Sequence, residues 1–271
     1  MTASIEIKTT GLRNVARAAM LCGALFAFAG TAAHADPLAT GAKNYKPFAV
    51  EHIGKAVAGA KELQAAVKAG DVKKAQAAWI KSRKGWEAAE PITGEFFEKL
   101  DSAIDAWPDA KHGYHAIEAA LFSGKLKEIA APVDELVGNL AEFHKQVSAP
   151  SFQFTPQGLL NGASGLAYEV GENKSKGGES PYAGTSLIDM RENVEGIEAV
   201  YKLVFQEALK AKDAKLADQI DDKIEDVEAL VKVKDLKHVN QPALRKAGEE
   251  LAVLMQSSAE KLGLEKPKLG E

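Results

Sequence analysis

The residues best suited to chemistry are a histidine and a glutamate three positions apart, His115 and Glu118. On a helix this spacing places both side chains on one face. Leu121 and Phe122 flank that face, so the pair is expected to lie among apolar side chains. An imidazole and a carboxylate placed there could bind a cation. A core histidine bonded to its neighbouring glutamate explains the same spacing, and the motif alone does not separate the two interpretations.

A second group of charged residues lies on the apolar face of a helix predicted over residues 72–90. On a helical wheel Arg83, Glu87 and Glu90 share the side of the two tryptophans of this segment, whereas four lysines point the other way. Burying an unpaired carboxylate is costly, so these acids need a partner or a cation. A buried salt bridge between Arg83 and Glu87, which are four residues apart, is the alternative to a cation site.

Asp101 and Asp105 add two more acids that share a helix face, since they are also four residues apart. One histidine with two or three carboxylates would form a hard, oxygen-rich site that suits iron, manganese or zinc and disfavours copper(I). The sequence holds no H-E-x-x-H motif and no E-x-x-H pair of the ferritin-like type, and it lacks a nucleophile elbow and a phosphate-binding glycine loop. The common zinc-protease, di-iron, hydrolase and nucleotide-binding motifs are therefore absent.

The elements that must position these residues are predicted to be helices. Apolar residues recur at spacings of three and four along nearly the whole chain after residue 35, and alternation typical of strands is nowhere sustained. Glycine and proline breaks divide this part into roughly seven to nine helices with mostly short connections. One helix should open at Thr155-Pro156, and the helix with His115 should open at Trp107-Pro108. We expect an all-α fold of two packed antiparallel helical-bundle lobes, over roughly residues 36–150 and 151–271.

The first 35 residues have the features of a secretory signal peptide. Three basic residues precede an uncharged apolar run from Ala18 to Ala32, and Ala33-His34-Ala35 supplies an A-x-A cleavage site. Cleavage after Ala35 and a periplasmic location are expected, with a retained membrane anchor as the alternative. Cleavage would remove Cys22, the single cysteine, and so exclude disulfides, thiolate ligands and covalent c-type haem from the mature chain. We expect no haem.

Composition limits the possible partners. The chain has 271 residues, of which 46% are hydrophobic and 27% charged, a balance that excludes a disordered acidic tail and a multi-span membrane protein. The formal net charge of −4 offers no broad basic surface. A nucleic-acid partner is therefore not expected.

Several of these residues form an ordered set of motifs. The set comprises Gly-x-His-x-x-Glu at Gly113, His115 and Glu118, Arg-x-x-Trp-Glu-x-x-Glu-Pro from Arg83 to Pro91, and Asp-x-x-Ile-Asp at Asp101, Ile104 and Asp105. In this order the motifs resemble the imelysin-like family, a metallopeptidase-type family that includes short, single-domain EfeO/EfeM-like periplasmic iron-uptake proteins. Looser matches follow at Glu169-Val170, Gly178-Glu179, Tyr182 and Asn193-Val194-Glu195-Gly196. The resemblance covers most of residues 45–205.

The resemblance implies a metal-binding cleft between two bundle lobes and a role in iron acquisition. Carried over by position, it implies His115, Glu118, Glu90 and Asp105 as metal ligands, with Glu87 and Asp101 in reserve. Arg83 would orient the carboxylates, Gly113 would leave room for a close approach, and Glu169, Tyr182 and Asn193 are weaker candidates from the facing lobe. The chain reads Ala183-Gly184-Thr185-Ser186 where the EfeO type usually carries Ser-His-x-Asp, so the resemblance implies no secondary site in this segment.

Three functions remain open at this point. The leading hypothesis is a non-catalytic periplasmic protein that binds ferrous or ferric iron, with zinc or manganese as other possible ions. Its partner would be a membrane iron permease or a companion periplasmic protein. The second is a zinc-dependent metallopeptidase with Glu87 or Glu90 as general base. The third is a metal-free helical interaction module, whose polar cluster fixes only how the lobes pack.

Overall fold

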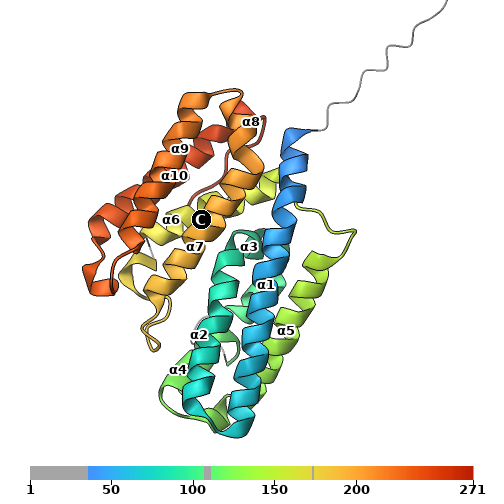
Figure 1. The fold of residues 1–271 in the computed structure, drawn as a ribbon, viewed down its shortest axis with the longest axis vertical. Helices are drawn as coiled ribbons and strands as arrows, with labels where there is room; N and C mark the ends of the chain where they lie inside the picture. Colours follow the sequence, from blue (N-terminus) through green and yellow to red (C-terminus); the bar gives the residue numbers. More distant parts are fainter. Residues whose placement is uncertain (1–35, 107–110, 173, 271) are drawn as a thin grey trace, which may run out of the picture. The chain divides into compact units, whose positions relative to one another are not determined.

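The computed structural model describes residues 36–106, 111–172 and 174–270, and most of these residues are helical (Figure 1). The α-helices are α1 (Pro37–Ala69), α2 (Val72–Ala89), α3 (Thr93–Ile104), α4 (Gly113–Phe122), α5 (Ala130–Ser148), α6 (Pro156–Glu172), α7 (Ser186–Val200), α8 (Gln206–Lys210), α9 (Ala214–Val231) and α10 (Gln241–Leu262). Short 3-10 turns lie at Glu90–Ile92, Leu126–Glu128, Lys174–Lys176 and Leu236–His238, and a π-helical turn lies at Tyr201–Phe205. No β-strand occurs in the described ranges, so the predicted all-α fold is confirmed.

The helices begin and end where side chains or glycines satisfy the free backbone groups. Asp36 accepts the N–H of Leu38 at 3.0 Å at the start of α1, and Gly70 ends that helix with a left-handed φ of 72°. Asp71 then accepts the N–H of Lys74 and starts α2. Because only Gly70 and Asp71 separate the two long helices, α1 and α2 pack side by side as an antiparallel pair.

Close backbone approach fixes the position of α2, the helix that carries the first site residues. A Cβ atom added at Gly85 of α2 would lie 2.5 Å from the carbonyl oxygen of His52 in α1, and one at Gly59 of α1 would lie 2.5 Å from the backbone nitrogen of Ser82. At both glycines the backbone of the other helix lies where a side chain would otherwise be. The side of α2 that faces α1 therefore carries Ser82 and Gly85.

Figure 1 shows two groups of helices, α1 to α5 and α6 to α10, which pack against each other. Two glycines mark the contact between the groups. A Cβ at Gly196 of α7 would lie 2.4 Å from the carbonyl oxygen of Ala88, and one at Gly162 of α6 would lie 1.8 Å from that of Pro91. The end of α2 and the turn after it are thus held against α6 and α7. The expected lobe boundary near residue 150 stays a prediction.

Two predicted helix starts and the predicted close approach at Gly113 can be compared with the structure. The helix expected at Thr155-Pro156 is α6, and the Thr155 hydroxyl accepts the N–H of Gly158 at 3.2 Å. The expected start at Trp107-Pro108 lies outside the described residues, and α4 begins only at Gly113, where φ is 79°. A Cβ there would lie 2.8 Å from the carbonyl oxygen of Ile104, so the close approach predicted for Gly113 is made by the chain's own backbone.

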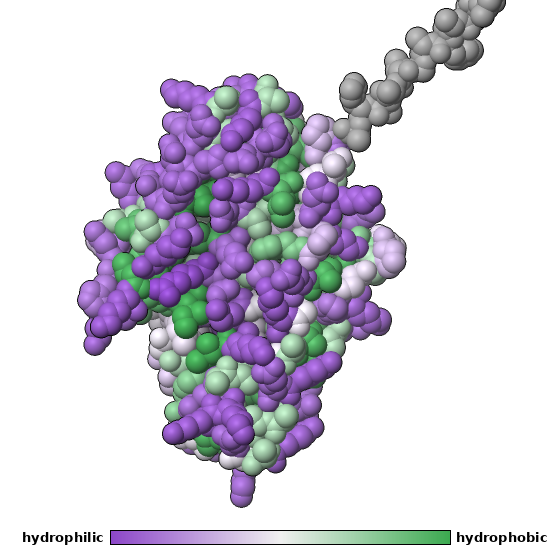
Figure 2. All heavy atoms as spheres, in the orientation of Figure 1, coloured by the Kyte–Doolittle hydropathy of each residue, from purple (hydrophilic) through white to green (hydrophobic). Residues whose placement is uncertain are grey.

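The surface seen in Figure 2 is mostly hydrophilic, with apolar side chains in small patches. The exposed large apolar residues of the described part are Tyr182, Leu203 and Val253. Among the described helices, none is both long enough and apolar enough to span a bilayer. The predicted signal peptide and its cleavage site lie outside the described residues.

Candidate metal centre

Arg83 is the centre of a buried charged cluster. Its side chain is only 1% exposed, and its guanidinium lies 2.5 Å from Glu87, 2.8 Å from Glu179 and in direct contact with Asp105. A fourth carboxylate, that of Asp189, lies 3.9 Å from Nε. The Arg83–Glu87 salt bridge considered as an alternative to a cation site is therefore present, as one contact of a larger cluster. These acids come from α2, the end of α3, the loop before α7 and α7 itself.

Lys174 is the second buried cation and follows α6 in a short 3-10 turn. Its Nζ lies 2.8 Å from both carboxylate oxygens of Glu90, 3.4 Å from Oε2 of Glu87 and 3.3 Å from Oε1 of Glu179. Asn193 of α7 lies beside it, and its Nδ2 donates to Glu87 Oε2 at 2.8 Å and to Glu90 Oε2 at 2.6 Å. Glu87 and Glu90, at the end of α2, are thus bound by two residues of the second helix group, Lys174 and Asn193.

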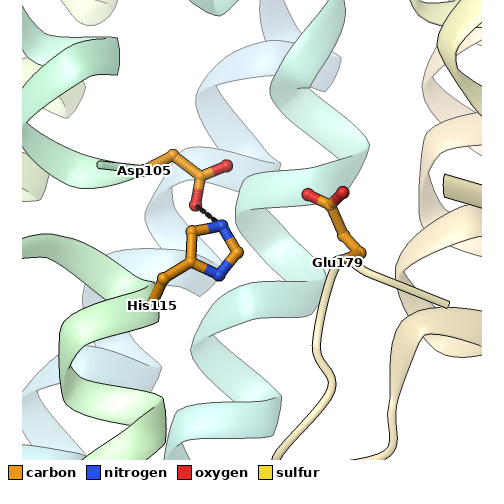
Figure 3. A group of neighbouring side chains, drawn as sticks. All are labelled: Asp105, His115 and Glu179. Carbon is orange, nitrogen blue, oxygen red and sulfur yellow. Dashed lines mark ion pairs between the residues drawn. The ribbon is translucent and has the colours of Figure 1, made fainter. Parts of the chain in front are cut away.

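His115 faces Asp105 and Glu179, as Figure 3 shows. Its Nε2 lies 3.4 Å from Asp105 Oδ1, and Asp105 also accepts the indole N–H of Trp86 at 3.1 Å. One ligand atom from each of Asp105, His115 and Glu179 lies within 4.8 Å of the others. Glu87, Glu90 and Glu179 form a second such group, which shares Glu179 with the first.

Glu118 binds the backbone of the loop before α7. Its Oε1 accepts the backbone N–H groups of Tyr182 and Ala183 at 2.8 and 2.7 Å, and its Oε2 lies 3.8 Å from His115 Nδ1. Glu118 is buried and belongs to neither group of potential ligands found among the described residues. It ties the loop that carries Glu179 to α4. The Tyr182 side chain, by contrast, is exposed.

A polar cavity of about 570 Å³ lies beside the cluster. Glu90, Asp105, His115 and Glu179 line it, as do two further predicted acids, Asp101 and Glu169. Five of the eleven predicted site residues thus line the cavity, whereas Arg83, Glu87 and Asn193 are buried and do not line it.

The carboxylates named here outnumber the two buried cations Arg83 and Lys174, and their pKa values shift in opposite directions. Burial alone would raise the pKa of Asp105, but the charge of Arg83 prevails and lowers it to about 2. Burial raises the pKa of Glu90 well above its usual range, and Lys174 only partly offsets this. Burial and the neighbouring Glu87 likewise raise the pKa of Asp189. A further cation would stabilise the charged forms of these acids.

Three residues of this cluster were not assigned a role from the sequence. Glu179 was noted only as part of a loose family match, and Lys174 and Asp189 had no motif at all. Lys174 and Glu179 lie in irregular segments of the second half of the chain, where helical periodicity gives no sign of what is buried, whereas Asp189 lies in the first turn of α7. The Gly178-Glu179 match was the one signal that could have identified Glu179.

Comparison with known proteins shows which family this chain belongs to. A family model described as imelysin matches residues 41–112 and 109–260. An Efem/EfeO family lipoprotein of Staphylococcus aureus (strain MRSA252) is 34% identical over 205 residues, which cover 71% of either chain. The iron uptake system component EfeO of Escherichia coli O1:K1 is 33% identical over 183 residues, 64% of this chain and 48% of the relative, so the match spans about half the relative's length.

A solved structure shows the same fold. The crystal structure of an iron-regulated protein A precursor from Parabacteroides distasonis matches 86% of this chain and 97% of its own with a TM-score of 0.69, at 15% sequence identity. The family model covers well over half of the sequence, and the staphylococcal relative matches above 30% identity across more than two thirds of its own length. The chain therefore belongs to the imelysin family.

Proposed function

We propose that this chain is a periplasmic metal-binding protein of an iron-uptake system. It binds iron at the cavity beside Arg83 and passes the ion to a membrane iron permease or a companion periplasmic protein. The observation that carries this proposal is the excess of buried acid around His115. Five carboxylates, those of Glu87, Glu90, Asp105, Glu179 and Asp189, pair with the two buried cations Arg83 and Lys174. The relatives named as iron-uptake components support the choice of ion.

The donor set fits a hard cation. Asp105, His115 and Glu179 would hold the ion, since imidazole and carboxylate together suit iron and also admit manganese or zinc. Glu90 lines the same cavity, and Asp101 and Glu169, which also line it, would attract the hydrated ion as it enters. Export follows, in this proposal, from a signal peptide cleaved after Ala35. The name of the staphylococcal lipoprotein is consistent with an exported relative.

Titration of the full chain with Fe²⁺ under anaerobic conditions tests the proposal. Calorimetry should show binding of near one ion per chain. At a free ion concentration 100 times the dissociation constant, binding stabilises the native state by about 2.7 kcal/mol. For a chain of this size the melting temperature should then rise by about 5–10 °C.

Two outcomes would contradict this function. If iron, manganese and zinc neither bind nor shift the melting temperature, the cluster serves only to pack the helices, as in a metal-free interaction module. If the zinc-loaded protein cleaves denatured casein and Glu90→Gln abolishes the cleavage, the chain is a metallopeptidase instead.

A matched pair of variants at Glu118 separates anchoring from ligation. Glu118→Ala leaves the N–H groups of Tyr182 and Ala183 without their acceptor and releases the loop that positions Glu179. Iron affinity should fall about 10–100-fold, the usual effect of losing a partner that orients a ligand. Glu118→Gln retains an amide oxygen that accepts both N–H groups, so calorimetry should show most of the affinity kept. Equal losses in the two variants would instead identify Glu118 as a ligand.

A further inference from the structure

The two groups of potential ligands are arranged as two adjacent cation sites with one carboxylate in common. Asp105 and His115 belong to the first group, Glu87 and Glu90 belong to the second, and Glu179 belongs to both. A carboxylate shared in this way can bridge two ions, as in two-metal sites where the ions lie about 3.5–4 Å apart. The cluster therefore has donors for two neighbouring ions.

The second group already contains a positive charge. The ammonium of Lys174 lies within 3.4 Å of all three of its members, and its closest contacts are the two oxygens of Glu90 at 2.8 Å. The side chain is 3% exposed, so this ammonium is desolvated and depends on these carboxylates. Arg83 contacts both groups, whereas the ion pairs of Lys174 are with the members of the second. Lys174 is the cation that distinguishes them.

Hydrogen bonds order the backbone of the short turn that carries Lys174. The hydroxyl of Ser175 donates to the carbonyl of Gly171 at 2.7 Å, and the N–H of Gly177 donates to the carbonyl of Lys174 at 2.9 Å. The first bond ties the short turn to the end of α6, and the second closes the turn itself. An ion entering the second group would have to expel a buried ammonium from three carboxylates, which costs several kcal/mol unless the lysine finds water.

We propose that Lys174 is a tethered cation that occupies the second carboxylate group and limits this protein to one bound metal ion, held by Asp105, His115 and Glu179. The inference rests on the proposed function, because it presumes that the first group binds a metal. It adds that the second group is a metal site in all respects except that a side chain fills it. Removing the ammonium should convert the centre into one that binds two bridged ions.

Counting bound Mn²⁺ in the full chain tests this inference. The wild type should bind one ion and give the electron paramagnetic resonance spectrum of an isolated Mn²⁺. Lys174→Met, which keeps the length of the side chain without its charge, should bind two ions and give a spin-coupled spectrum. Lys176→Met is the matched control, because it removes an exposed lysine from the same turn, and it should still bind one. The double variant Lys174→Met/Glu90→Gln loses a ligand of the second group and should return to one ion.

Any other result contradicts either this inference or the proposed function on which it rests. A wild type that binds two ions, or a folded Lys174→Met protein that binds one, overturns the inference and leaves the proposed function standing. A wild type that binds no ion overturns the proposed function. If Lys174→Met is unfolded without metal, two equivalents of Mn²⁺ should restore its thermal transition, and failure to do so also overturns the inference.

Discussion

Arg83→Met should lower the free energy of unfolding by about 3–5 kcal/mol, the cost of removing one partner from a buried ion pair. The guanidinium contacts Glu87, Asp105 and Glu179, which would be left buried without their main counter-charge. Its Cζ also lies 5.4 Å from the centre of the Tyr114 ring, a cation–π contact that methionine cannot replace. Urea unfolding followed by circular dichroism measures the change.

Arg245→Met provides the matched control for this experiment. Arg245 also pairs with two glutamates, Glu172 and Glu249, but its side chain is 55% exposed. Exposed ion pairs contribute little because water and salt screen them, so the unfolding midpoint should hardly move. If the two arginine variants unfold at the same urea concentration as the wild type, the cluster around Arg83 does not stabilise the fold.

Iron binding should fall more than about 100-fold in His115→Ala and in Glu179→Gln, beyond the usual effect of losing an outer partner. The reason is that both residues belong to the group of potential ligands that lines the cavity, and each would supply one ligand atom of three. Anaerobic calorimetry with Fe²⁺ gives the affinity, and circular dichroism establishes that each variant is folded.

The controls for this prediction are the same substitutions at exposed positions. His238→Ala removes a histidine whose side chain is 62% exposed, and Glu142→Gln alters a glutamate that is 44% exposed; both lie outside the cavity. Both should bind iron as the wild type does. A folded His115→Ala protein with unchanged affinity would show that iron binds elsewhere.

Helical periodicity made much of the fold and half of the cluster predictable. Charges on the tryptophan face of residues 72–90 correctly indicated buried acids, because a helix with a buried face shows in its sequence which charges cannot reach water. The helix Val72–Ala89 and the burial of Arg83 and Glu87 agree with that pattern. The same reasoning placed His115 and Glu118 together among apolar residues, and both are buried.

The partners of these acids were not predictable in the same way. Lys174 and Glu179 lie between α6 and α7, where a short turn and a loop replace regular helix. Spacing along the chain then no longer indicates which side chain points inward. Glu118 illustrates another limit, because a motif names the residue but does not show that its oxygen accepts two backbone N–H groups from residues more than sixty positions away.

The cluster around Arg83 also implies that thermal stability and metal binding oppose each other in this fold. Buried charge clusters are often less stable than well-packed apolar side chains of the same volume. Arg83 and the acids that surround it could be replaced by leucine, methionine and phenylalanine. Such a variant would then melt at a higher temperature, but it would have no ligands for a metal ion. The buried charged cluster thus costs the fold stability, and selection for heat resistance alone should replace its residues first.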